Sequence, residues 1–252
     1  MKYQGWDISL NHGAIVQLVD GDLDWFTYWT DKSGSAKKHR GAVHLNVVKL
    51  KKVAGDRHSF EHARLAFVRD LLFRVVTRSR PDFVAIEDYA MARAQGAHQI
   101  GEGGGAARLA LWDHGIRYRT VDPYSVKMFA TYDGTADKIL VEEVVRDRWG
   151  ADFGKYNVEP PKNKAKKANR QTSEDLCDAF TLAKLVYTEA MLRSGELSLA
   201  ELEHNKERQV FMRVTKAFPV NILGREWIYN ERWKKTLIKK LRGSMAYIRE
   251  AA

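Results

Sequence analysis

The first thirty residues alternate short apolar runs with polar breaks, which is the pattern of an antiparallel strand meander. The breaks are Asn11-His12-Gly13 and Asp20-Gly21-Asp22, and both suit tight turns because Gly and Asn tolerate a positive φ. The pattern therefore predicts three strands, at residues 3–10, 14–19 and 25–30.

A long helix is predicted next, because apolar residues recur every three or four positions from Phe60 to Val76. Pro81 ends it, since proline disfavours a helical residue before it. Phe83–Ile86 is a short apolar run suited to a buried strand, and Glu87 follows directly. The sequence thus places a carboxylate at the end of this strand.

The second half continues the alternation, with a strand predicted at 118–121 and helices at about 135–149 and 172–193. A hydroxyl at Thr172 or Ser173 can cap the last helix. Strands that alternate with helices after an opening meander predict an α/β sheet of mixed direction, flanked by helices. We expect a domain over 1–194 and a C-terminal extension over 195–252. The extension is expected to start as a helix and then to interleave aromatic with basic residues.

Charge and composition narrow the class of protein. The 252 residues carry 42 Lys and Arg against 32 Asp and Glu, a net charge of +10, which favours a polyanionic partner over a neutral one. A single cysteine, Cys177, excludes internal disulfides, and it is expected to be buried. No apolar run has the roughly 18 residues of a membrane helix, and no signal peptide is recognisable. These features predict a cytoplasmic, nucleoid-associated protein with no membrane partner; a host and a viral origin are both compatible with them.

Four acidic residues stand where an α/β sheet gathers its functional groups. They are Asp7 inside the first strand, Glu87 at a strand end, and Asp175 and Asp178 three apart on the last helix. Hard oxygen donors could bind two Mg²⁺ ions about 3.5 to 4 Å apart, the arrangement that supports phosphodiester hydrolysis. Each acid also has a simpler interpretation, such as charge placement at a helix N-terminus for Asp175.

Three motifs resemble a known family. Gly5-Trp6-Asp7-Ile8-Ser9, Phe83-Val84-Ala85-Ile86-Glu87 and the segment 174–183 (EDLCDAFTLA) resemble, in order and spacing, the RuvC group of Holliday junction resolvases in the ribonuclease H superfamily. The resemblance covers about residues 3–190. It implies a ribonuclease H-like mixed five-stranded sheet flanked by helices, and a homodimer. It also implies that Asp7, Glu87, Asp175 and Asp178 bind two Mg²⁺ ions per active site, with Mn²⁺ as a substitute.

The same resemblance implies further functional residues. Lys127 and Lys138 match the two functional lysines of the family, although both could be ordinary surface lysines. Tyr89 is a candidate for the wedge that unstacks bases, with a core tyrosine as the alternative. The basic arm from Pro160 to Gln171 would grip the DNA backbone through Lys162, Lys164, Lys166, Lys167 and Arg170.

Two segments invite other interpretations. The glycine run 101–105 is followed by no Gly-Lys-Ser/Thr, which excludes a phosphate loop, and the resembling family forms a subunit-pairing helix there. The Trp and Lys/Arg interleaving at 225–242 could stack on unpaired bases or form an amphipathic helix on the core.

The expected function is therefore a crossover junction endodeoxyribonuclease in DNA recombination and repair. It would resolve four-way junctions by paired nicks that leave 5′-phosphate and 3′-hydroxyl ends. The alternatives are a flap, fork or RNA-strand nuclease of the same fold, and a non-catalytic basic DNA-binding protein. An actin-like sugar kinase or chaperone ATPase would share Asp7, Ser9 and Gly13 but needs a second domain with an Asp-Gly phosphate loop.

Overall fold

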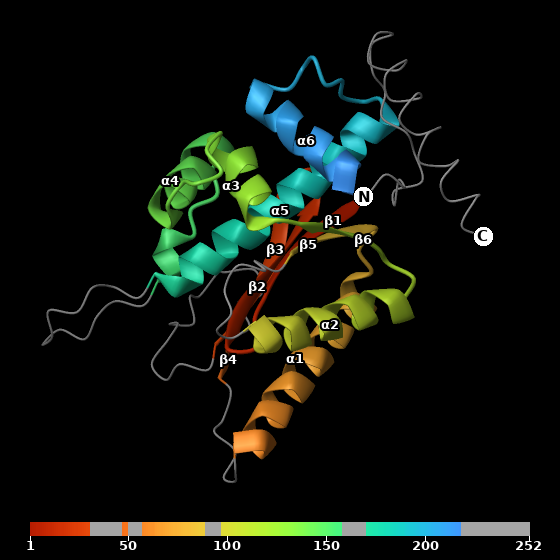
Figure 1. The fold of residues 1–252 in the computed structure, drawn as a ribbon, viewed down its shortest axis with the longest axis vertical. Helices are drawn as coiled ribbons and strands as arrows, with labels where there is room; N and C mark the ends of the chain where they lie inside the picture. The colour runs from red at the N-terminus through yellow and green to blue at the C-terminus, as the bar shows by residue number, and fades with distance from the viewer. Residues whose placement is uncertain (31–46, 50–56, 89–96, 158–169, 218–252) are drawn as a thin grey trace, which may run out of the picture. The chain divides into compact units, whose positions relative to one another are not determined.

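The computed structural model describes residues 1–30, 47–49, 57–88, 97–157 and 170–217 (Figure 1). Tyr89, the four lysines at 162–167 and the aromatic-basic stretch 225–242 lie outside the described residues. Arg170 lies inside them. The predictions that fall on the excluded segments stay predictions.

The described strands form one mixed sheet in the order β4-β3-β2-β1-β5-β6. The central strand, β1, pairs antiparallel with β2 and parallel with β5, and β5 pairs parallel with β6. The strand bounds are β1 Lys2–Ile8, β2 His12–Val19, β3 Asp22–Thr30, β4 Val47–Lys49, β5 Phe83–Glu87 and β6 Arg117–Val121. The predicted mixed sheet is confirmed, and the three-residue β4, which pairs parallel with β3, adds a short sixth strand at its edge.

Six α-helices are described in these ranges: α1 Arg57–Ser79, α2 Ala97–Asp113, α3 Pro123–Thr131, α4 Lys138–Trp149, α5 Gln171–Ser194 and α6 Asn205–Ala217. The helix predicted from residue 172 is thus confirmed as α5. The predicted helix near 135–149 is α4. The glycine run 101–105 lies within α2, in agreement with the helix that the resemblance implies there.

One face of the sheet carries the apolar core. Side chains alternate between the two faces of a strand, so Trp6 and Ile8 of β1 point to the same side. They pack there with Ile86 of β5, Val68 of α1 and Ala107 of α2 in one buried cluster. Helices α1 and α2 therefore cover this face.

The other face of β1 packs against α5 through a glycine. A Cβ placed on Gly5 would collide with the backbone of Ala179 and Ala183. Glycine is thus required for the close approach of the strand to the helix. Tyr3, two residues earlier on the same face, makes an edge contact with Tyr187 at a ring distance of 5.2 Å. Strand and helix therefore run in opposite directions along this contact.

The chain divides into two compact units, Met1–Tyr187 and Thr188–Ala252, with the boundary inside α5. The first unit contains the whole sheet and α1 to α4. In the second, Arg193 and Glu189 form a buried ion pair with a separation of 2.8 Å, and α6 buries Val210 and Phe211. No helix among the described residues is both long enough and apolar enough to cross a bilayer.

Candidate metal centre

Asp7 and Glu87 meet because of the register between two parallel strands. Trp6 of β1 pairs with Ile86 of β5, so Asp7 and Glu87 are the next residues along the two strands. Neighbouring strands are about 4.8 Å apart, and residues in register point to the same face. Since Trp6 and Ile86 enter the core cluster on the other face, both carboxylates point toward the side on which α5 packs.

Helix α5 supplies the other two acids. Along β1, Tyr3 contacts Tyr187 of α5, and Gly5, two residues later, lies against Ala183 and Ala179. Later residues of β1 therefore lie against earlier residues of α5. The next residue of β1 on this face is Asp7, which therefore faces the first turns of α5. Asp175 and Asp178 lie there, with exposed side-chain fractions of 1% and 14%.

The four carboxylates interact electrostatically in this confined space. Burial, together with the charges of Asp175, Glu87 and Asp178, raises the pKa of Asp7 well above its ordinary value. Burial and the neighbouring Asp178 raise the pKa of Glu87 to about 8. Burial, opposed by Lys138 and reinforced by Asp175, raises the pKa of Asp178 to about 6. Burial and repulsion between neighbouring carboxylates therefore both disfavour the ionised forms of Asp7, Glu87 and Asp178.

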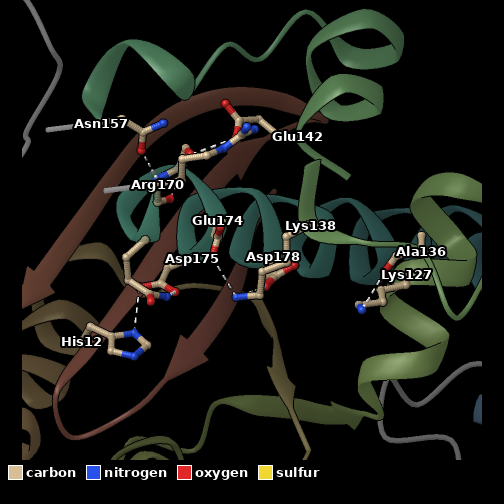
Figure 2. A network of polar contacts seen from close by, with 12 residues as sticks. His12, Lys127, Ala136, Lys138, Glu142, Asn157, Arg170, Glu174, Asp175 and Asp178 are labelled. Atoms are coloured by element: carbon tan, nitrogen blue, oxygen red, sulfur yellow. Dashed lines mark hydrogen bonds and ion pairs between the residues drawn. The ribbon is translucent and has the colours of Figure 1, made fainter. Parts of the chain in front are cut away.

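Lys138 contacts two acidic side chains of α5. Its Nζ is 3.3 Å from Glu174 Oε2 and 3.9 Å from Asp178 Oδ2 (Figure 2). Glu174 and Asp178 are four apart and share one face of α5, so a single ammonium group can contact both. Burial would lower the pKa of Lys138, but Asp178 and Glu174 outweigh it and raise that pKa.

The connection between α3 and α4 fixes both lysines. Tyr132 ends α3 with a left-handed backbone, φ 63°, and Asp137 caps α4 by accepting from the amide of Leu140 at 2.8 Å. Lys138 is therefore the first residue of α4. Lys127 of α3 donates from Nζ to the carbonyl oxygen of Ala136 at 2.7 Å. Its charge still lowers the pKa values of Glu87 and Asp178, so it faces the acidic site.

Two residues that the sequence interpretation missed hold Asp175. The Nδ1 of His12 is 2.9 Å from Asp175 Oδ2, and Gln171 donates from Nε2 to Oδ1 at 2.7 Å (Figure 2). The Gln171 contact has a readable signal, because residues four apart meet on a helix. The His12 contact joins residues 163 positions apart and has no local signal. Glu174 was likewise passed over in favour of the two aspartates.

Arg170, expected to contact DNA, has a partner within the protein. Its guanidinium donates to Glu142 Oε2 at 2.7 Å, and the same oxygen accepts from the hydroxyl of Ser173 at 2.9 Å. Asn157 accepts from the backbone amide of Ser173 at 3.1 Å. Asn157, before the segment 158–169, is thus hydrogen-bonded to the start of α5, and Arg170, after it, is paired with α4 (Figure 2).

The donor chemistry of the site fits a hard divalent cation. Carboxylate oxygens are the ligands that Mg²⁺ prefers. A bound cation would stabilise the ionised forms of Asp7 and Glu87, whose pKa values are raised by burial and by the neighbouring carboxylates. Over the described ranges, no three His, Cys, Asp or Glu side chains are already arranged as a metal cage. Both oxygens of Asp175 are engaged by His12 and Gln171. The acidic site therefore suits a divalent cation in its charge and in the type of its donor atoms.

The fold and site together define an α/β protein with a mixed sheet and an acidic centre flanked by two lysines. Comparison with known proteins specifies the relationship. The family model described as crossover junction endodeoxyribonuclease RuvC matches residues 32–148, slightly less than half of the chain. This range contains Glu87, Lys127 and Lys138. The resemblance to RuvC resolvases expected from the three motifs is thereby confirmed.

A curated RuvC from Gloeobacter violaceus is 31% identical over 88 residues. The match covers 35% of this chain and 51% of the relative, so the chain spans about half the length of that protein. Two solved structures from Thermus thermophilus are also similar, RuvC itself and RuvC in complex with a Holliday junction substrate. They are 21% and 18% identical, each with a TM-score of 0.49 over 76% of this chain and 96% of the other.

Proposed function

We propose that this protein is a Mg²⁺-dependent, structure-selective DNA endonuclease that resolves four-way junctions by paired nicks. It would leave 5′-phosphate and 3′-hydroxyl ends. The observation that carries the proposal is the set of carboxylates around α5, where burial and the neighbouring acidic charges raise the pKa values of Asp7, Glu87 and Asp178. Asp175 is one of those neighbouring charges. The family match favours a junction resolvase over the other classes of protein that have an acidic site.

Asp7, Glu87, Asp175 and Asp178 would hold two Mg²⁺ ions, or Mn²⁺ in their place. Bound there, the ions would activate water and stabilise the leaving oxygen of a phosphodiester. The protein's own residues supply orientation and charge. Glu87 and Asp178 must be ionised to act as ligands, and Lys127 and Lys138 favour that form by lowering their pKa values. The same two lysines would hold the scissile phosphate beside the acids.

The substrate requires further contacts. The basic arm, with Lys162, Lys164, Lys166, Lys167 and Arg170, would grip the phosphate backbone, and Tyr89 would act at the junction centre. A net charge of +10 supports a polyanionic partner.

A homodimer would present two equivalent sites, as paired cuts in a four-way junction require. Helix α2 offers a surface for pairing. Leu109 and Trp112 are 61% and 77% exposed on it, and a Cβ on Gly105 would meet no atom within 4 Å. Large apolar side chains beside a glycine allow close packing of a second helix. A second copy of the chain is the partner that the proposed function requires.

Cleavage of a substrate panel tests the proposal. An immobile four-way junction, a three-way junction, a flap and an RNA–DNA hybrid are each incubated with the full chain, with and without Mg²⁺. The proposal predicts symmetric nicks in the four-way junction that a ligase can reseal. Faster cleavage of the flap or hybrid would favour another nuclease of this fold. Binding without cutting in Mg²⁺ would favour a non-catalytic DNA-binding protein.

A further inference from the structure

His12 contacts the acidic site from an element that contributes none of its carboxylates. It is the first residue of β2, directly after the turn from β1, and its side chain is 30% exposed. Its Nδ1 is 2.9 Å from Oδ2 of the buried Asp175 (Figure 2). A carboxylate that binds a cation is ionised and only accepts hydrogen bonds, so in that state Nδ1 of His12 is the donor of this contact.

The turn that presents His12 is held from two sides. Trp29 of β3 donates from its indole nitrogen to the carbonyl oxygen of Ser9 at 3.1 Å. The guanidinium of Arg64, a buried residue of α1, donates to the side-chain oxygen of Asn11. His12 itself pairs with Thr30 in the β2–β3 ladder. The imidazole therefore projects from a fixed backbone and not from a freely moving loop.

Asp175 is consequently restrained at both oxygens. Gln171 holds Oδ1 from the preceding turn of α5, and His12 holds Oδ2 from the other side. A carboxylate bonded in this way is fixed about its χ angles, so a bound cation does not have to bear the cost of ordering it. An acidic ligand without such partners would rotate away from Asp7 and Asp178 under mutual repulsion.

We propose that His12 is a positioning residue that, together with Gln171, orients the Asp175 carboxylate for binding of a divalent cation. This inference rests on the proposed function, because it assumes that the acidic site binds such a cation. It adds a residue of the β1–β2 turn that acts through Asp175 and does not itself contact substrate.

Titration of the full chain with Mn²⁺ by calorimetry, in the absence of DNA, tests this role. We expect His12→Ala to bind Mn²⁺ about tenfold more weakly than the unchanged protein, the lower end of the effect of losing a ligand's hydrogen-bond partner. His12→Asn should restore the affinity, because its side-chain amide can donate from a position close to Nδ1. His12→Gln should not, because its amide reaches the position of Nε2.

His114→Ala is the matched control, since the Nδ1 of His114 also makes a hydrogen bond, to the carbonyl oxygen of Ala110, but outside the acidic site. It should leave Mn²⁺ affinity unchanged. Gln171→Leu removes the second restraint on Asp175 and should weaken binding independently, which keeps the inference testable if His12→Ala does not fold. Thermal unfolding without metal identifies any variant that is unfolded.

The outcomes separate the two proposals. If the unchanged protein does not bind Mn²⁺, the proposed function itself fails. If it binds and both His12→Ala and Gln171→Leu bind equally well, only the positioning role is overturned. Equal weakening by His12→Asn and His12→Gln would also overturn it, because the effect would then not depend on a donor at Nδ1.

Discussion

The two faces of strand β1 are built from residues that alternate along the same seven positions, yet they serve different ends. On one face Trp6 and Ile8 are buried among α1, α2 and β5. On the other face Gly5 permits contact with α5, and Asp7 adds a carboxylate to an acidic site. Burial of apolar side chains on the first face stabilises the fold. On the second face, the desolvated Asp7 carboxylate, repelled by its acidic neighbours, is unfavourable for folding.

This contrast shows how one strand separates stability from chemistry. Trp6 has no exposed surface, and even its indole nitrogen donates to the side chain of Gln4 at 2.8 Å. Asp7 is tolerated because the residues opposite it on the apolar face secure the strand. Substitutions of the acidic side chains themselves should therefore change activity and pH response more than they reduce stability.

The largest expected effect is on cleavage by Glu87→Gln. A several kcal/mol loss of transition-state stabilisation corresponds to a fall in rate of about 10³-fold. Above pH 8 the free energy of unfolding should rise, because a neutral amide replaces a desolvated carboxylate beside Asp178. Rate assays and urea unfolding measure the two effects. Asp113→Asn, at the exposed end of α2, is the control and should change neither quantity. If Glu87→Gln lowered the free energy of unfolding as well as the cleavage rate, the slower cleavage would reflect unfolding and not a lost metal ligand.

The same Gly→Ala substitution on the two sides of the sheet should change stability in opposite directions. Gly5→Ala would force a methyl group into the backbone of α5 and should lower the free energy of unfolding by about 3 kcal/mol or more. A Cβ on Gly103 of α2 would lie 3.5 Å from Leu10 and 3.6 Å from Ile8, an ordinary contact. Gly103→Ala should therefore stabilise the helix by roughly 0.5–1 kcal/mol. Denaturant unfolding of both variants tests the contrast, and equal losses would refute it.

Stability in the absence of divalent ions should fall as the pH rises from about 4.5 to about 8. The pKa of Glu87 is raised from 4.5 to about 8, so in this window the folded protein holds a proton that the unfolded chain has released. The expected loss is roughly 2 kcal/mol, less than the full shift implies because Glu87 is partly exposed. Thermal unfolding across this range measures the slope. Glu87→Gln should flatten it, and a stability that rises with pH would contradict the sign.

The smallest effect concerns Arg170 and Glu142. Each of Arg170→Ala and Glu142→Gln should lower the free energy of unfolding by about 0.5–1 kcal/mol, since this ion pair is partly exposed. The double variant should lose less than the sum. If Arg170 also contacts DNA, only Arg170→Ala will weaken junction binding, and only at low salt. If both variants changed junction binding equally, Arg170 would act only through its ion pair with Glu142 and not through contact with DNA.

The regular elements were largely predictable, and the exceptions have local causes. The meander and α5 follow from alternation and three- or four-residue spacing over long segments. Helix α3 lies between the strand predicted at 118–121 and the helix predicted at about 135–149, where no element was predicted. It has only nine residues, and proline at its first residue is easily taken for a helix breaker. Proline also favours the first position of a helix, and Asp122 caps α3 by accepting from the amide of Ser125 at 2.9 Å. Strand β4 has only three residues, too few for a period to show.

The glycine run of α2 illustrates a different difficulty. Four glycines within five positions indicate a loop by intrinsic propensity, because glycine is unfavourable inside a helix. A Cβ on Gly103 would make only ordinary contacts, so packing does not require these glycines. Ala107, Ala110 and Leu111 of the same helix are buried in the core cluster. The apolar packing of α2 thus overrides the local preference of its glycines.

In the candidate site, the acids were predictable and their partners were not. Asp7 and Glu87 could be found from strand ends, and Asp175 and Asp178 from helical spacing. The engagement of Asp175 by His12 depends on how closely β2 approaches α5, which no local pattern encodes. The pairing of Arg170 with Glu142 likewise joins two helices that are separate in the sequence.

The most direct test of the central claim is a nicking assay on an immobile four-way junction with the unchanged protein and Asp7→Asn, in Mg²⁺. We expect the unchanged protein to make paired nicks only when Mg²⁺ is present. Asp7→Asn should bind the junction equally well but cut it about 10³-fold more slowly. Cutting by Asp7→Asn at the unchanged rate would contradict the assignment of the acidic site as the metal centre.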